Sequence, residues 1–227
     1  MKNTVLITGG AQRIGAIISE RIAREGWNVI IHYNKSRNKA FNLKKKLSSY
    51  KINSCCIKAD LSKESDLKKL FTYAKKEMGG VNCLINNAST FELDSIENIK
   101  KKNWDYHLNT NVWAPIFLIQ QFIKNLPKKS NGNIINILDQ RVVNLTPFFT
   151  TYTLTKSVLW TLTQILALSL APKIKVNAIG PGPTFSSKRQ TSKQFKNQYM
   201  KVPLKKAVDP NEIAEAVLFI LNSNSLT

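Results

Sequence analysis

A tyrosine and a lysine four residues apart are the strongest candidates for chemistry in this sequence. Tyr152 and Lys156 begin an apolar stretch with helical period, and residues i and i+4 share one helix face, so the ammonium can lie beside the phenol. A free tyrosine has a pKa near 10, and lowering that pKa by about two to three units takes roughly 3–4 kcal/mol. A cation at about 4 Å in an effective dielectric constant of about 20 supplies that much. The pair predicts acid–base catalysis by Tyr152, with a pKa that Lys156 lowers.

Asp139 is the carboxylate best placed to act with this pair. It follows the apolar run Ile134–Leu138, and a parallel sheet brings the end of that run to the same edge as the next helix. A carboxylate that closes an apolar strand is costly to bury unless a partner or a ligand satisfies it. We therefore expect Asp139 to lie in the same site as Tyr152.

A glycine-rich segment predicts where a phosphate-bearing cofactor binds. Thr8–Gly15, with the sequence TGGAQRIG, lies between an apolar run and a stretch of helical period. Glycines let the backbone turn tightly and approach a pyrophosphate, and the N-terminus of the helix supplies free N–H groups and a positive dipole.

The end of the second apolar run predicts which cofactor fits. An NAD-binding domain places an acidic residue there, against the ribose hydroxyls of the adenosine, and the segment 32–37 has no carboxylate. Lys35, Ser36 and Arg37 with a hydrogen-bonding His32 instead suit a 2′-phosphate. We therefore expect NADP(H) rather than NAD.

The elements that must position these groups alternate between short apolar runs and longer helical stretches, which is the βαβ pattern of a parallel sheet. The predicted strands are Val5–Thr8, Val29–Tyr33, Ser54–Ala59, Cys83–Asn86, Ile134–Leu138 and Ile174–Ala178. Helices are predicted to begin near Arg13, Arg37, Lys63, Asn103 and Tyr152, with a last helix over Pro210–Asn222 capped by Asp209. The fold class is α/β, one Rossmann-like doubly wound parallel sheet with helices on both faces, in a single domain over residues 1–227.

Composition excludes several classes of protein. The 227 residues are 43% hydrophobic and 21% charged, which is typical of a globular chain and not of disorder or a coiled coil. No apolar run approaches the roughly 20 residues that cross a bilayer, and no secretory signal is visible, so we expect a cytoplasmic protein without membrane contact. Cys55, Cys56 and Cys83 lack metal-ligand spacing and are expected to be buried, reduced thiols.

The net charge of +20 needs an explanation. A strongly positive field attracts nucleic acids or a phosphorylated cofactor. The lysines are scattered over the sequence, however, and no basic arm with interleaved aromatic residues is present. We therefore favour solvated basic surfaces and expect no nucleic-acid partner.

Taken together, the motifs resemble those of the short-chain dehydrogenase/reductase family over essentially the whole chain. The matching segments are Thr8–Gly15, Asn86–Ala88, Asn111, Tyr152 with Lys156, and Asn177–Gly182. The resemblance implies that Tyr152 gives or takes the proton, that Lys156 holds the nicotinamide ribose and lowers the tyrosine pKa, and that Asn111 anchors a proton-relay water. The cofactor-binding residues expected from the motifs and the resemblance are Gly9, Arg13, Ile14, Gly15, His32, Lys35, Ser36, Asp60, Leu61, Asn87, Ala88, Lys156, Pro181 and Gly182.

Two departures from the general family pattern are informative. Asp139 stands where the family usually has a serine, and Arg13 replaces the middle glycine of the cofactor turn. Both departures are similar to the pteridine reductases and the bacterial dihydromonapterin and dihydrofolate reductases. That resemblance implies that Phe91 stacks on a pterin sandwiched against the nicotinamide and that Ser89 and Arg13 bridge cofactor phosphates and substrate. Asp139 would serve in proton delivery, so Arg13, Ser89, Phe91, Asp139 and Tyr152 form the expected substrate site.

The last part of the chain carries two expectations. The polar, lysine-rich segment 184–201 lacks apolar periodicity and is expected to be a mobile substrate lid. The sequence stops directly after the helix that usually precedes a final edge strand, so we expect that strand to be missing through truncation. Its loss affects the surface through which such enzymes form homo-oligomers, dimers or tetramers.

The sequence therefore predicts an NADPH-dependent reductase of a dihydropteridine, dihydromonapterin or dihydrofolate, with Tyr152 as proton donor and no metal. One alternative is a carbonyl reductase of 3-oxoacyl thioesters. Alternatives from other classes are a non-catalytic NADP sensor and a basic nucleic-acid binder.

Overall fold

The computed structural model describes residues 3–128, 130–187 and 189–227. Its centre is a six-stranded parallel sheet with the order β3-β2-β1-β4-β5-β6. The strands are β1 Thr4–Ile7, β2 Asn28–Tyr33, β3 Ser54–Lys58, β4 Cys83–Asn86, β5 Gly132–Ile137 and β6 Ile174–Ile179. The order reverses between β1 and β4, which is where a doubly wound sheet opens its ligand-binding crevice. The predicted fold class is confirmed.

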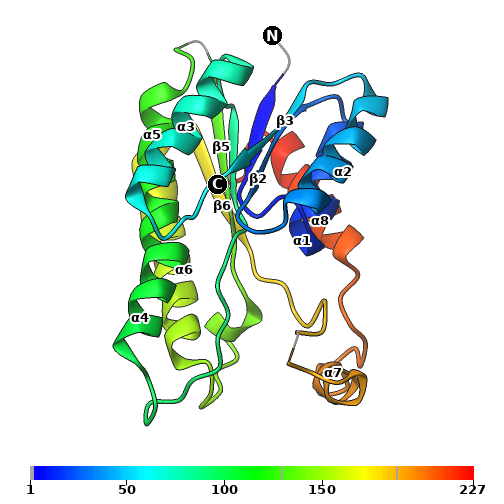
Figure 1. Ribbon diagram of the computed structural model, residues 1–227, viewed down its shortest axis with the longest axis vertical. Helices are drawn as coiled ribbons and strands as arrows, with labels where there is room; N and C mark the ends of the chain where they lie inside the picture. The colour runs from blue at the N-terminus through cyan, green and yellow to red at the C-terminus, as the bar shows by residue number, and fades with distance from the viewer. Residues whose placement is uncertain (1–2, 129, 188) are drawn as a thin grey trace.

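Helices cover both faces of the sheet (Figure 1). One layer contains α1 Arg13–Arg24, α2 Arg37–Leu47 and α8 Pro210–Asn222, and the other contains α3 Glu64–Met78, α5 Ala114–Asn125 and α6 Thr150–Leu170. Side chains alternate across the strands, so Ile7 joins the core under the first layer while its neighbour Leu6 joins the core under the second. This two-sided burial explains why β1 and β4, whose residues are all buried, are near-continuous apolar runs.

The predicted element boundaries either match the structure, as those of β4 and α8 do, or differ from it by one or two residues. α6 begins at Thr150, two residues before Tyr152, and α4 Lys101–Leu108 begins two residues before Asn103. The Asp209 side chain accepts a hydrogen bond from Asn211 N–H at the start of α8, as its predicted capping role requires. Cys55 and Cys83 are buried, Cys56 is half-buried, and all three are free thiols.

The segment 184–201, expected to be a mobile lid, contains a helix that the sequence analysis did not predict. It contains α7, Ser192–Tyr199, which begins with a capping box in which Thr191 and Gln194 satisfy each other's backbone N–H groups. The capping box marks the start of α7. Because the segment lacks apolar periodicity, the periodicity of the sequence did not predict this helix. Lys188 lies outside the described residues, and the mobility of the segment stays a prediction.

The end of the sequence lies against the sheet. After α8, the backbone N–H of Val176 donates to the Thr227 hydroxyl and the Asn177 amide donates to the carbonyl of Leu226, which places residues 226 and 227 along β6. In the described part of the chain, no helix combines the length and the apolar character needed to cross a membrane.

Candidate active site

The glycine turn after β1 is packed against the end of β4. The Thr8 hydroxyl accepts hydrogen bonds from the backbone N–H groups of Asn87 and Ala88, at 2.9 and 3.0 Å, and the Asn87 amide donates to the Thr8 carbonyl at 2.8 Å. A Cβ on Gly15 would lie 2.3 Å from the Gly9 carbonyl oxygen, and Gly9 itself has a φ of +62°. Only glycine therefore permits this approach of helix, turn and strand.

This turn fits a pyrophosphate. Gln12, at the start of α1, makes no side-chain capping bond, and the first turn of α1 has no acidic residue. The positive end of the helix therefore lies open at the switch point of the sheet, where an anion is favoured. Ile14, the second residue of α1, packs its half-buried side chain against the core beneath the turn.

The ring of His32 contacts two backbone groups of the protein. Its Nδ1 accepts a hydrogen bond from the Gly9 N–H at 2.9 Å, and its Nε2 lies 3.1 Å from the Ala59 carbonyl oxygen. Burial lowers the pKa of His32 to about 4, so the ring is neutral and both of its nitrogens are used within the protein. His32 thus holds the glycine turn in place, and its expected part in cofactor binding stays a prediction.

The other candidates for the 2′-phosphate lie at the end of β2. Lys35 is exposed, Ser36 is the first residue before α2, and the Arg37 guanidinium lies over the Phe41 ring. None of them is in an ion pair with a carboxylate among the described residues. They remain free to meet an anion.

Arg13 reaches the lid instead of the turn on which it lies. It has a φ of +54°, a conformation that explains why glycine is usual at this position. Its guanidinium donates to the carbonyl oxygens of Ser186 and Phe185 and lies over the Phe185 ring. In this structure Arg13 connects the cofactor turn with segment 184–201, and its expected bridging of phosphate and substrate stays a prediction.

The remaining cofactor candidates lie in the loops that follow β3 and β6. The Asp60 carboxylate accepts from the backbone N–H and hydroxyl of Ser62, while the Leu61 side chain is buried in the core. After β6, the Pro181 carbonyl accepts from the N–H of Gln140 at 3.0 Å, so this loop is tied to the one that carries Asp139. A Cβ on Gly182 would lie 3.2 Å from the Val208 side chain, so the loop packs closely there.

Tyr152 and Asp139 lie at one edge of the sheet and are in direct contact. The Tyr152 hydroxyl donates to Asp139 Oδ2 at 2.9 Å, and the Arg141 backbone N–H donates to Asp139 Oδ1 at 2.9 Å. The Lys156 ammonium donates to the Ile137 carbonyl at 2.7 Å and lies 5.8 Å from the centre of the Tyr152 ring. α6 and the end of β5 thus bring the three side chains together at the carboxyl edge of the sheet.

The pKa of Tyr152 is raised, whereas the sequence predicts a lowered one. Burial and the negative charge of Asp139 raise the pKa of Tyr152 well above its usual value, with Arg141 acting in the opposite direction. Burial lowers the pKa of Lys156 to about 8. The expected lowering of the tyrosine pKa by Lys156 is not found, because the nearest charge to the phenol is the carboxylate that accepts its hydrogen bond.

Asn111 lies in a π-helical turn, Asn109–Trp113, between α4 and α5. Its Oδ1 accepts from the Thr90 N–H at 2.8 Å, and its Nδ2 donates to the Thr90 carbonyl and the Thr155 hydroxyl. The amide therefore ties the loop after β4 to α6. π-Helical turns are frequent at functional sites, but the expected contact with a relay water stays a prediction.

Phe91 lies beside Tyr152 and against an aromatic residue that the sequence reasoning missed. Its ring meets the Tyr152 ring edge-on, with 4.7 Å between centroids, and stacks on the Phe149 ring at 4.3 Å and 5°. One face of Phe91 is thus covered by Phe149, so a flat substrate would use its other face or replace Phe149. An aromatic residue three positions before Tyr152 was the signal available in the sequence. Ser89 is exposed on the same loop.

Asp94 is a second residue that the sequence reasoning missed. Its buried carboxylate accepts from the Thr151 N–H at 3.2 Å, and its carbonyl accepts from the Phe149 N–H at 2.8 Å. Asp94 thereby fixes the loop that carries Phe91 to the start of the helix that carries Tyr152.

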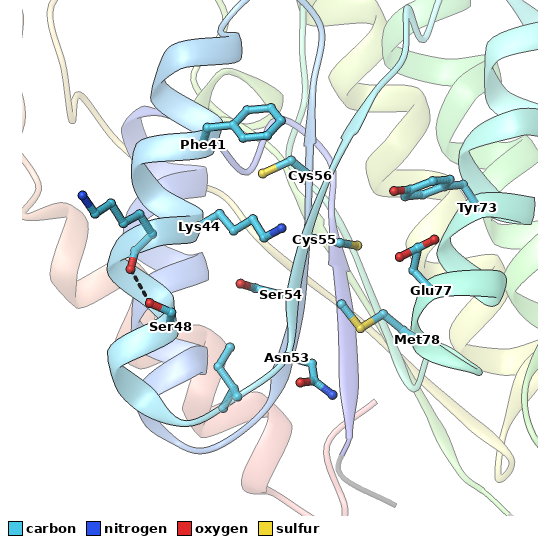
Figure 2. A pocket seen from close by; sticks show the side chains of 12 residues that line it. Phe41, Lys44, Ser48, Asn53, Ser54, Cys55, Cys56, Tyr73, Glu77 and Met78 are labelled. Atoms are coloured by element: carbon cyan, nitrogen blue, oxygen red, sulfur yellow. Dashed lines mark hydrogen bonds between the residues drawn. The ribbon is translucent and has the colours of Figure 1, made fainter.

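A cavity of about 690 Å³ lies elsewhere, along the amino half of β3. Phe41 and Lys44 of α2 line it on one side of the strand, and Tyr73, Glu77 and Met78 of α3 line it on the other (Figure 2). None of the predicted site residues lies in it. Ligands of such sheets bind beyond the carboxyl ends of the strands, so we place the site at Tyr152 and not here.

In the described part of the chain no group of His, Cys, Asp and Glu could hold a metal ion.

The chain is similar to a family profile, to solved structures and to a curated relative. The profile of the family described as short chain dehydrogenase matches residues 3–197. The structure of FolM alternative dihydrofolate reductase 1 from Brucella canis, complexed with NADP, is 39% identical with a TM-score of 0.94, over 99% of this chain and 89% of that chain. A short chain dehydrogenase from Burkholderia cenocepacia, in complex with NADP, is 26% identical with a TM-score of 0.91, over 98% of this chain and 91% of that chain. The 3-oxoacyl-(acyl-carrier-protein) reductase FabG of Staphylococcus epidermidis is 28% identical over 99% of this chain and 93% of that protein.

Proposed function

The chain belongs to the short chain dehydrogenase family and is an NADPH-dependent oxidoreductase, and we propose that it reduces a pterin-type ring. The observation that carries the substrate proposal is the hydrogen bond between Tyr152 and Asp139, beside the ring of Phe91. The likeness to a FolM dihydrofolate reductase supports the same assignment. The substrate would be a dihydropteridine, a dihydromonapterin or a dihydrofolate.

The cofactor supplies a hydride when it is bound, and the protein positions the acceptor and the proton. The glycine turn with Asn87 and Ala88 would hold the pyrophosphate side, and Lys156 would hold the nicotinamide ribose. Phe91 would orient the substrate ring. The Tyr152 phenol, which is protonated at neutral pH and which its raised pKa keeps protonated into the alkaline range, would donate its proton to the ring nitrogen. Asp139 would orient that hydroxyl and assist proton delivery.

The test is NADPH oxidation measured with dihydrobiopterin, dihydromonapterin, dihydrofolate and an acetoacetyl thioester. We expect kcat/KM to be highest for one of the three pterins. A preference for the thioester would contradict the proposal and favour the second candidate, a 3-oxoacyl thioester reductase, for which the likeness to FabG is the supporting observation. In that case Asp139 would be only a cap of the strand end.

We also propose that the protein is a homo-oligomer. Helices α5 and α6 and the turn before α5 expose large apolar side chains, which a second copy of the chain would cover. These side chains are Trp113, Ile123, Leu154, Val158, Ile165 and Leu168. Sedimentation of the purified protein should give a mass above that of one chain. A cytoplasmic location, one domain over 1–227 and the absence of a nucleic-acid partner stay predictions.

A further inference from the structure

Arg141 is a cation beside the candidate substrate position that has no carboxylate partner. Its guanidinium carbon lies 4.7 Å from the centre of the Phe149 ring and 5.9 Å from the centre of the Phe91 ring. One of its nitrogens, Nη1, donates to the Thr146 hydroxyl at 2.8 Å. Its remaining N–H groups have no acceptor among the described residues, and the side chain is only half-buried.

The other arginines near this edge are already engaged. Arg189 pairs with the Glu92 carboxylate and donates to the Phe91 carbonyl, and Arg13 donates to two carbonyl oxygens of the lid. The nearest carboxylate to Arg141 along the chain is Asp139, whose two oxygens accept from Tyr152 and from the Arg141 backbone N–H. Arg141 is therefore the guanidinium at this site that is open to an external anion.

We infer that Arg141 binds a carboxylate on the substituent of the substrate, so that the preferred substrate is a pterin with an anionic side chain, as in dihydrofolate, and not one with a neutral polyol. The rings of Phe149 and Phe91 and the Thr146 hydroxyl hold the planar guanidinium in place, which limits the entropy lost on binding. A guanidinium with several free N–H groups can bind a carboxylate through two parallel hydrogen bonds. This inference rests on the proposed function, because it presumes a pterin ring near Phe91.

The test compares dihydrofolate with dihydromonapterin in three proteins. Arg141→Gln removes the charge, Arg141→Lys keeps the charge but not the paired N–H geometry, and Arg24→Gln removes a positive charge that stacks on Tyr50 at a distant helix end. For Arg141→Gln we expect KM for dihydrofolate to rise about 10- to 100-fold and KM for dihydromonapterin to change less than about twofold. Arg141→Lys should be intermediate, and Arg24→Gln should match the unaltered protein.

Binding of p-aminobenzoylglutamate, which has the anionic tail without the pterin, gives a second measurement in the presence of NADPH. It should bind the unaltered protein and lose about tenfold in affinity with Arg141→Gln. Equal effects of Arg141→Gln on both substrates, or a preference of the unaltered protein for dihydromonapterin, would overturn this inference and leave the proposed function standing. Reduction of neither substrate by the unaltered protein would overturn both.

Discussion

The phenol of Tyr152 donates its hydrogen bond to the carboxylate of Asp139, at 2.9 Å, while the Lys156 ammonium donates to the Ile137 carbonyl. A carboxylate in this position favours the protonated phenol, and burial acts in the same direction. Burial and the carboxylate therefore favour the protonated form of Tyr152. That state suits the reductive direction, in which the substrate ring must receive a proton.

Asp139→Asn should move the alkaline limb of the pH–rate profile. Reduction requires the protonated phenol, so activity falls as pH rises through the Tyr152 pKa. Removing the carboxylate lowers that pKa and also the pKa of Lys156, which is about 8 and which Asp139 raises. The limb should therefore shift to lower pH, while kcat for pterins falls about 10²-fold or more. Steady-state rates from pH 6 to 11 measure both effects. An unshifted limb with full turnover would show that Asp139 only caps the strand end.

Lys156→Met should abolish turnover and stabilise the fold. Burial lowers the pKa of Lys156 from 10.5 to about 8, which corresponds to a penalty of about 3 kcal/mol for the charged form. The variant also loses the hydrogen bond to the Ile137 carbonyl, which offsets about 1–2 kcal/mol of the stabilisation gained by removing the buried charge. We expect a net gain of about 1–2 kcal/mol in the free energy of unfolding at pH 7, measured in urea.

The pH dependence provides the control for Lys156→Met. Because the folded-state pKa lies below the unfolded-state value, the penalty is present in full below about pH 8 and disappears as pH rises towards 10.5. The stability difference between the two proteins should therefore shrink between these pH values. A difference that is independent of pH would mean that packing, and not charge, is responsible.

Gly15→Ala should disrupt the cofactor turn. The added methyl group would lie 2.3 Å from the Gly9 carbonyl oxygen and 2.6 Å from the Asn87 amide nitrogen. We expect a loss of about 3 kcal/mol or more in stability and at least tenfold weaker NADPH binding, about 1.4 kcal/mol. Gly26→Ala is the matched control, because Gly26 has a φ of +82° but no atom within 4 Å of its added Cβ. It should cost about 1 kcal/mol through backbone strain and leave NADPH affinity unchanged.

NADPH should bind at least tenfold more tightly than NADH. Lys35 and Arg37 lie at the end of β2 without carboxylate partners among the described residues, and a tenfold ratio needs only about 1.4 kcal/mol from charge-assisted bonds. Fluorescence titration of both cofactors measures the ratio. Lys35→Asp should bring the two affinities close together, and equal affinities in the unaltered protein would contradict the assignment.

The sheet was predictable from sequence because strands that are buried on both faces must be apolar throughout, as Leu84 and Ile85 of β4 are. The position of Tyr152 beside Asp139 was predictable for a similar reason, since the topology brings consecutive strand and helix ends to one edge. Such sequence patterns predict the position of the backbone. They do not predict which partner the functional group of a side chain contacts.

That limit explains the differences between prediction and structure. Helical spacing places Lys156 on the face of Tyr152, but the ammonium binds the Ile137 carbonyl. His32 lies at the expected strand end, yet both of its ring nitrogens are used by Gly9 and Ala59. In each case the partner is a backbone group brought from a distant part of the sequence, and no local pattern identifies it.

Arg13 holds the lid through the carbonyl oxygens of Phe185 and Ser186, groups that every amino acid provides. The ring of Phe185 adds a contact, but the hydrogen bonds are indifferent to which side chains the segment carries. Residues 184–201 can therefore diverge in sequence while their attachment to the cofactor turn is retained. If this segment is the substrate lid that the sequence predicts, then transplanting it between relatives that share the arginine should change substrate range and keep the attachment.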